Sequence, residues 1–185
     1  MRVMNQETTY FFLFITLLAS NFCLAQELYS TSSAQVEFFS EAPIENIKAD
    51  SNKGISVLNL DTGEIAFQVK INTFQFEKAL MQEHFNENYM ESEKFPKASF
   101  KGKITNLDIQ QNTTQDVLIK GDLRMHGISR SVEIPAKLQL RDETLILEST
   151  FNVACEDYEI KIPKLLWKNI AEIIQVDLTA NYKKY

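Results

Sequence analysis

The two histidines and two cysteines carry the side chains that would most readily act as general bases, thiol nucleophiles or zinc ligands. His84 lies in FEKALMQEHF, His126 in RMHGISR and Cys155 in VACEDYEI, so the three are far apart in the sequence. A zinc site normally takes three or four ligands, often at short spacings such as HxxxH or CxxC, and none of these spacings is present. We therefore predict no metal site and expect structural roles for both histidines.

Nucleophilic catalysis has no clearer signal in the sequence. There is no GxSxG motif and no glycine-rich loop of the kind that cradles phosphate groups. We expect Cys155 to be a small buried hydrophobic residue, with a reactive or intermolecular thiol as the alternative. The sequence thus predicts a protein that is not an enzyme and has no catalytic residues and no cofactor. A hydrolase that depends on His84 or His126 is a further alternative.

The first 25 residues have the pattern of a secretory signal peptide. Arg2 precedes an apolar run from Phe11 to Ala19 that is far shorter than the roughly 20 residues needed to span a membrane. Cleavage is expected after Ala25, and the mature protein then consists of one domain, residues 26–185, located in the periplasm or secreted.

Attachment of a lipid at Cys23 is an alternative to simple cleavage. Phe22 argues against it, because lipoprotein signals carry a small residue at that position. If cleavage follows Ala25, Cys23 leaves with the leader and Cys155 is the one cysteine that remains, so an internal disulfide is excluded.

The charge of the chain excludes several classes of partner. Its formal net charge is −6, and there is no cluster of basic residues. Such a protein is a poor candidate for binding nucleic acid or an anionic membrane surface, since both require positive charge.

Alternation of apolar and polar residues dominates the sequence after the leader. In EIAFQVKI, for example, Ile65, Phe67, Val69 and Ile71 fall on one face of an extended strand. Comparable segments, together with turn-prone stretches such as residues 61–63, predict eight or nine antiparallel strands. Both a two-sheet sandwich and a closed barrel can bury the apolar faces of such a series. The residue pattern leaves these two architectures open.

Two segments depart from this alternation and predict short helices. Residues 76–85 place Phe76, Leu80 and His84 at helical spacing, and residues 163–172 begin with a proline, which favours a first helical turn. Helices this short need a sheet to pack against.

The thirteen phenylalanines exceed what a small hairpin stack would need. They could form an ordinary aromatic core, or they could surround a cavity for an apolar ligand. The pattern alone does not separate these two possibilities.

Three long motifs then suggest a family. HFNENYMESEKFPKASFKGKI, IKGDLRMHGISRSVEIPAKL and FNVACEDYEIKIPKLLWKNIAEIIQVDLTANY resemble, in order and spacing, the YceI-like family of bacterial periplasmic lipid-binding proteins. The resemblance extends over residues 27–184. It implies an all-β fold, an eight-stranded antiparallel lipocalin-like barrel with one or two short helices. It also implies that the lumen binds a polyisoprenoid, an isoprenoid quinone or a prenyl phosphate, as a carrier or storage protein.

The resemblance also implies a set of lumen residues and partners. We expect Phe95-Pro96 to fix the start of a strand, Gly127 to lie in a turn, and His84 to lie near the mouth. The expected partner is the isoprenoid lipid, with transient membrane contact, and the protein would be a monomer or homodimer. Strands of about nine residues would make a tunnel about 30 Å long. The residues expected to line it are Ile65, Phe67, Val69, Phe74, Phe100, Ile104, Ile119, Leu123, Ile134, Leu138, Leu147, Phe151, Val176 and Leu178.

Two features differ from the family pattern or threaten an open lumen. Glu159 stands where many relatives have glycine, and Trp167 could narrow or plug one end. A barrel filled by its own side chains would not be a carrier. The alternative function is therefore a non-enzymatic stress-response or interaction barrel with a filled core.

Overall fold

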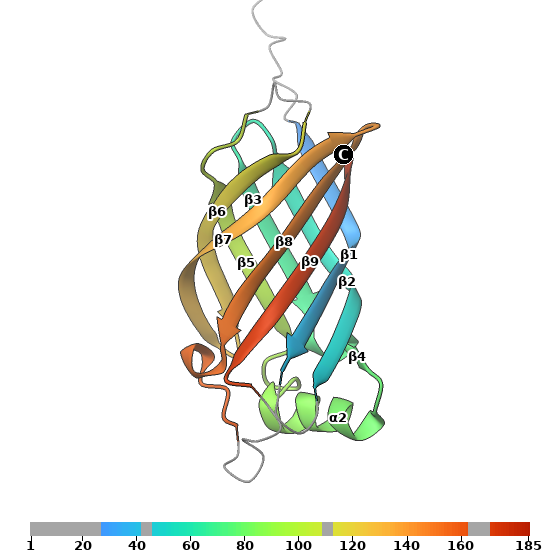
Figure 1. Ribbon diagram of the computed structural model, residues 1–185, viewed down its shortest axis with the longest axis vertical. Helices are drawn as coiled ribbons and strands as arrows, with labels where there is room; N and C mark the ends of the chain where they lie inside the picture. The colour runs from blue at the N-terminus through green and yellow to red at the C-terminus, as the bar shows by residue number, and fades with distance from the viewer. Residues whose placement is uncertain (1–26, 42–45, 109–112, 163–170) are drawn as a thin grey trace, which may run out of the picture.

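Eight long antiparallel strands form a closed barrel in the computed structural model, which describes residues 27–41, 46–108, 113–162 and 171–185 (Figure 1). A further two-residue strand, β4, pairs with β2. Neighbours around the barrel run in the order β1, β2, β3, β5, β6, β7, β8, β9 and back to β1. The strands are β1 (Leu28–Ser40), β2 (Ile47–Asn59), β3 (Glu64–Lys70), β4 (Gln75–Phe76), β5 (Lys97–Ile104), β6 (Gln115–Met125), β7 (Ile128–Arg141), β8 (Thr144–Ala154) and β9 (Ile173–Lys184).

Strand β1 closes the barrel because it pairs on both of its edges. Val36 is opposite Ser51 of β2 and Leu178 of β9. Two register shifts between Thr31 and Val36 interrupt the β1–β2 ladder, which lets this strand bend. In a closed barrel every strand has a neighbour on both sides, whereas a sandwich leaves the N–H and C=O groups of its edge strands unpaired. The barrel expected from the family resemblance is thereby confirmed.

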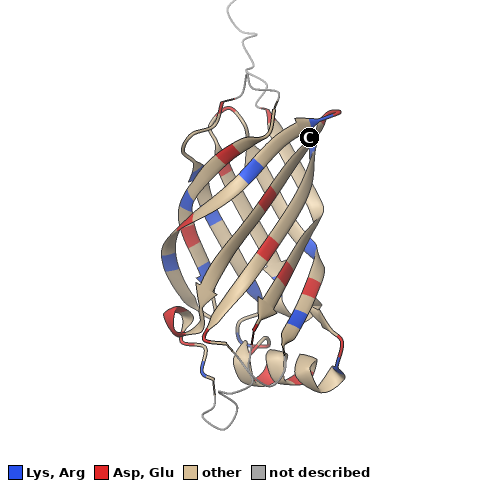
Figure 2. Ribbon diagram, viewed as in Figure 1, with Lys and Arg blue, Asp and Glu red and all other residues tan. Residues whose placement is uncertain are grey.

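Alternation along each strand separates the lumen from solvent. In β3, Ile65 and Val69 are buried, whereas Glu64 and Lys70 at its two ends are exposed. Charged residues accordingly lie along the outer surface of the barrel (Figure 2).

Several connections have the geometry that their residues predict. His126 and Gly127 link β6 to β7 with φ values of 51° and 79°, and Asp142 and Glu143 link β7 to β8 with values of 46° and 64°. Two consecutive positive φ values match the right-handed twist of a two-residue hairpin. Strand β5 begins directly after Pro96, and Gly127 lies in a turn, as expected.

The two strands β5 and β6 approach most closely at a pair of glycines. Gly102 is directly opposite Gly121, and a Cβ atom on Gly121 would lie 2.3 Å from the carbonyl oxygen of Lys101. A Cβ atom on Gly102 would lie 2.6 Å from the ring of Phe100. Side chains at this pair would push the two strands apart.

Side chains fill one end of the barrel. Around the β2–β3 and β7–β8 connections, the interior holds a continuous cluster that includes Leu58, Ile104, Leu138 and Tyr182, each 3% exposed or less. The expectation that the lumen is one tunnel along its whole length is therefore wrong. Ile104 and Leu138 pack inside this filled end instead of lining an open space, because large side chains from several strands meet there.

A short helical segment covers the opposite end, which receives the last residues of β1, β3, β6 and β8 (Figure 1). The α-helix α2 (Ala79–His84) continues into a π-helical turn, η3 (Phe85–Tyr89). The helix begins later than predicted because Phe76 pairs with Ala49 in β4. Leu80 of this helix is 61% exposed.

Three predictions fall outside the described residues. They are the signal peptide, the plugging of one end by Trp167, and the helix at residues 163–172, of which only the last two positions are described. A further short helix, η4 (Cys155–Tyr158), is of the 3-10 type and ends at Glu159, whose φ is 54°. Glycine adopts that conformation most easily. None of the helices in the described part of the chain is long and apolar enough to cross a membrane.

Replacing Gly121 by alanine tests the close approach of β5 and β6. We expect Gly121→Ala to lower the free energy of unfolding by about 1–3 kcal/mol, because its Cβ would clash with backbone atoms that cannot rotate away. Ser131→Ala, at an exposed position of β7, is the control and should change stability by less than about 0.5 kcal/mol. Urea unfolding followed by circular dichroism measures both. Equal midpoints for the two variants would contradict the argument.

Candidate functional site

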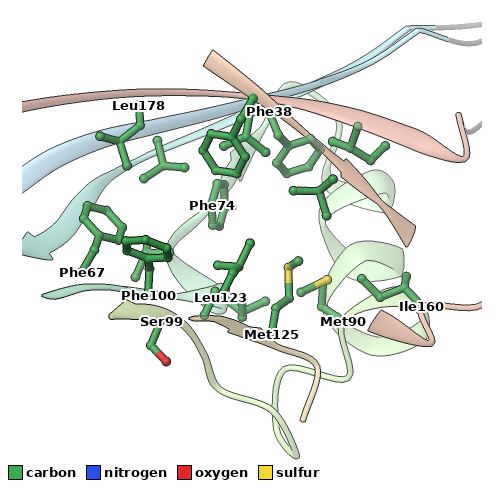
Figure 3. A pocket seen from close by; sticks show the side chains of 18 of the residues that line it. Phe38, Phe67, Phe74, Met90, Ser99, Phe100, Leu123, Met125, Ile160 and Leu178 are labelled. Atoms are coloured by element: carbon green, nitrogen blue, oxygen red, sulfur yellow. The ribbon is translucent and has the colours of Figure 1, made fainter. Parts of the chain in front are cut away.

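The half of the barrel under the helical segment contains a cavity of about 310 Å³ (Figure 3). This volume is at the lower end of the range of small-molecule sites, roughly 300–1,000 Å³. The walls come from the inward faces of all eight long strands, and the segment from Met81 to Met90 covers the mouth. Phe67, Phe100 and Leu178 lie toward the deep end, and Met90 and Ile160 lie toward the mouth.

Most of the residues expected in the lumen lie on this cavity wall. Eleven of them lie on strands and Phe74 directly precedes β4; the twelve are Ile65, Phe67, Val69, Phe74, Phe100, Ile119, Leu123, Ile134, Leu147, Phe151, Val176 and Leu178. Ile104 and Leu138 do not line it, because both are in the filled end. That the twelve residues contact a lipid stays a prediction.

The cavity also includes residues that were not selected from the sequence. Val36 and Phe38 of β1 follow the same alternation and could have been found from it. Met81, Met90 and Ile160 could not, because they lie in irregular or helical segments where period-two alternation gives no signal. Methionine is flexible and polarizable, so this mouth can adapt to the shape of a guest.

The hydroxyl groups of three wall residues are already engaged within the protein. Ser149 Oγ donates to the Pro135 carbonyl at 2.6 Å, and Ser40 Oγ accepts the Ala171 N–H at 2.9 Å. Tyr182 Oη is 2.8 Å from Ser56 Oγ. Ser99 Oγ points away from the cavity (Figure 3). The interior therefore offers apolar surface with few free polar groups to hold water or a polar ligand.

Four phenylalanines attach the helical segment to the barrel. Phe85 of η3 stacks on Phe38 of β1, with ring centroids 5.3 Å apart and an interplanar angle of 23°. It also contacts Phe74 and Phe76, at centroid distances of 5.7 and 5.0 Å. Such aromatic pairs contribute about 0.5–1.5 kcal/mol beyond their buried area. This Phe cluster, residues 38, 74, 76 and 85, fixes one side of the mouth.

His126 fixes the other side of the mouth. Its Nδ1 is 2.9 Å from the carbonyl oxygen of Tyr158, and its Nε2 is 3.3 Å from Oε1 of Glu91, while Phe95 packs against the ring at a centroid distance of 4.6 Å. A carbonyl and a carboxylate both accept hydrogen bonds, so the imidazole donates to both only when it is doubly protonated. His126 therefore joins the β6–β7 turn to η4 and to the segment that follows η3.

The charge of Glu91 is maintained by its neighbours. Burial raises the pKa of this carboxyl group, but Lys94 and His126 outweigh that effect and bring the pKa below its ordinary value. Glu91 thus stays ionised under neutral and mildly acidic conditions, where it can accept a hydrogen bond from His126 Nε2.

The residues considered for metal binding do not form a site. His84 and Cys155 both line the cavity, whereas His126 is engaged as described above. Among the residues described, no group of three or more histidine, cysteine, aspartate or glutamate side chains lies close enough to hold a metal ion. Cys155 is a buried free thiol, and burial, assisted by Glu172, raises its pKa to about 11.

A second depression lies on the outside of the barrel and is larger, about 730 Å³. Its rim is formed by serines, threonine, Lys101 and Lys183, with Ile55 and Val57 partly exposed between them. It is open to solvent and shallow in comparison with the interior. We therefore assign the candidate site to the inner cavity.

Comparisons with known proteins agree with this geometry. A family model described as the YceI-like domain matches residues 29–182. No curated protein sequence matches the chain.

Among solved structures, a polyisoprenoid binding domain from Saccharophagus degradans is similar, with a TM-score of 0.73 and 12% identity over 86% of this chain and 99% of that one. BcnA from Burkholderia cenocepacia has a TM-score of 0.70 and 12% identity over 82% and 96% of the two chains. A YCEI protein from Campylobacter jejuni has a TM-score of 0.61 and 14% identity over 78% and 90%. At these identities the likeness shows the fold.

The raised pKa of Cys155 predicts slow reaction with thiol reagents. Because the thiolate is the nucleophile, alkylation of the native protein by iodoacetamide at pH 8 should be far slower than alkylation of the same cysteine in urea, and it should accelerate as the pH rises toward 11. Mass spectrometry of timed samples measures this. Native and unfolded protein reacting at the same rate at pH 8 would show a reactive thiol instead.

Replacing His126 tests its role at the mouth. His126→Asn retains a residue that tolerates positive φ, but the shorter side chain cannot reach both Tyr158 and Glu91. We expect a loss of about 1–2 kcal/mol in unfolding free energy, measured by urea denaturation. His84→Asn is the control and should cost less than about 0.5 kcal/mol. A larger effect at position 84 than at 126 would refute this assignment.

Proposed function

The chain belongs to the YceI-like family, and we propose that it binds an isoprenoid lipid in the hollow half of its barrel, as a carrier or storage protein of the periplasm. The single observation that carries the proposal is an almost entirely apolar cavity in which the hydroxyls of Ser40, Ser149 and Tyr182 are already hydrogen-bonded. Such a space holds water poorly and gains free energy when an apolar chain replaces it. The similar domain described as polyisoprenoid binding supports the choice of ligand class.

Burial of apolar surface alone can account for tight binding of such a lipid. A tail of about four isoprene units, at about 0.8 kcal/mol per buried carbon, would gain roughly 15 kcal/mol gross. Ordering of the chain and loss of its freedom of movement consume a large part of this gain. A loose apolar fit with few polar contacts is therefore sufficient for binding.

The charge around the mouth favours a ligand with an uncharged head group. Residues 77–94 contain five glutamates and two lysines, and Figure 2 shows acidic residues along the helical segment. The described part of the cavity wall contains no lysine or arginine. A phosphate head group would meet a net negative charge at this segment and no lysine or arginine on the described cavity wall. Of the three ligand types considered, neutral polyisoprenoids and quinones fit better than prenyl phosphates.

A filled interaction barrel and an enzyme are the competing functions. A filled core is present at one end of this barrel, but the cavity in the other half supports a binding protein more strongly than a filled interaction barrel. An enzyme would have to use the wall residues His84 and Cys155, to which our proposal gives no catalytic role. Burial of the Cys155 thiol keeps it protonated, which makes it a poor nucleophile.

Native mass spectrometry of gently purified protein tests the proposal directly. We expect a bound apolar molecule, removed by organic extraction and identified as an isoprenoid, and recovery of the complex when the same lipid is added back. Protein denatured and refolded without lipid is the control. Repeatedly empty protein that also fails to bind added quinone or prenol would refute lipid binding.

The head-group preference predicts a difference between two ligands with the same tail. Geranylgeraniol should bind at least about tenfold more tightly than geranylgeranyl diphosphate at low ionic strength, and the gap should narrow as salt screens the glutamates. The double variant Glu83→Gln with Glu87→Gln should narrow it further. Displacement of a fluorescent apolar probe measures both affinities. Tighter binding of the diphosphate would overturn the preference for a neutral head.

A further inference from the structure

A layer of six residues separates the filled end of the barrel from the cavity. These residues belong both to the buried cluster of the filled end and to the cavity wall, and we call them the floor: Ile65, Phe100, Ile119, Ile134, Leu147 and Tyr182. They come from six different strands, so the floor extends around the lumen. Among the described residues, the floor closes the cavity on the side of the filled end, and we therefore call the cavity a blind pocket.

Tyr182 is the floor residue with the most rigid position. It is fully buried, and its phenol reaches past β1 to Ser56 of β2. Ser56 Oγ donates its proton to the Ala66 carbonyl at 2.8 Å, so the Tyr182 hydroxyl is the donor in its 2.8 Å bond to Ser56. Ala34 of β1 and Ala180 of β9, both fully buried, provide room for the ring. This chain of hydrogen bonds fixes the end of the ring on the β2 side of β1.

The floor limits the depth that a ligand can reach. Along β8, the wall extends from Leu147 at the floor to Val153 near the mouth. Six steps of about 3.3 Å on a strand tilted by about 40° correspond to a depth of roughly 15 Å. A tunnel through the whole barrel would measure about 30 Å and take a tail of about eight isoprene units. The blind pocket has room for about half of that.

We propose that the floor, with Tyr182 at its centre, selects lipids by tail length and limits the buried part of an isoprenoid to about four units. The ligand enters tail first, and its head stays at the mouth beside the helical segment. This inference rests on the proposed function for the choice of isoprenoids, whereas the length limit follows from the pocket alone. Longer tails would leave their excess carbons outside, where they add no further binding energy.

Affinities for a series of prenols test the limit. For the wild-type protein, we expect affinity to rise about tenfold with each added unit from geraniol through farnesol to geranylgeraniol, and then to level off for solanesol. The plateau should move to longer chains in Tyr182→Ala, which removes the ring. Tyr182→Phe keeps the ring and loses only the hydrogen bond, so its plateau should match that of wild type. Displacement of a fluorescent apolar probe gives the dissociation constants.

A second floor variant and a second series of ligands complete the test. If Tyr182→Ala does not fold, as judged by circular dichroism, Leu147→Ala deepens the same layer at a different strand and should move the plateau in the same direction. A parallel series of straight-chain alkanols measures the depth without assuming isoprenoid recognition. If alkanols show the plateau and prenols do not bind, the proposed function fails and the length limit stands. If affinity keeps rising through solanesol, or if neither floor variant moves the plateau, the floor does not select by length.

Discussion

The closed barrel imposes one constraint from which the other properties follow. Eight strands enclose an interior just wide enough to be filled by side chains or to hold one slender guest. The ring of paired strands is closed, because β1 joins both β2 and β9. Tyr182, Leu58 and Leu138 pack in the filled half, whereas the inward side chains of the other half, Phe67 and Phe74 among them, surround a cavity.

The mouth of that cavity depends on contacts between segments that are distant in sequence. The Phe cluster holds the helical segment to β1, and His126 links the turn after β6 to Glu91 and Tyr158. A ligand as long as the cavity must pass this segment to enter or leave. The two attachments differ in kind, since the first is aromatic packing and the second consists of polar contacts of an imidazole ring.

The interior stays apolar because its polar groups are paired with each other. Tyr182, Ser56 and the Ala66 carbonyl form one chain, and Ser149 bonds to the Pro135 carbonyl. An unpaired buried hydroxyl would cost free energy and attract water. Pairing these groups inside the wall leaves the surface of the cavity apolar.

The sequence by itself determined the strands, the two-residue turn at His126 and Gly127, and which faces are dry, because period-two alternation is a local property of an extended chain. Twelve of the fourteen residues expected in the lumen accordingly lie on the cavity wall. The choice between sandwich and barrel came from resemblance, since closure depends on the pairing of β1 with β2 and β9. Only the tertiary structure decided that Ile104 and Leu138 lie in a filled end and that Met81, Met90 and Ile160 border the mouth. Whether inward side chains meet across a lumen depends on the lengths of residues from all strands at one level, and no single segment contains that information.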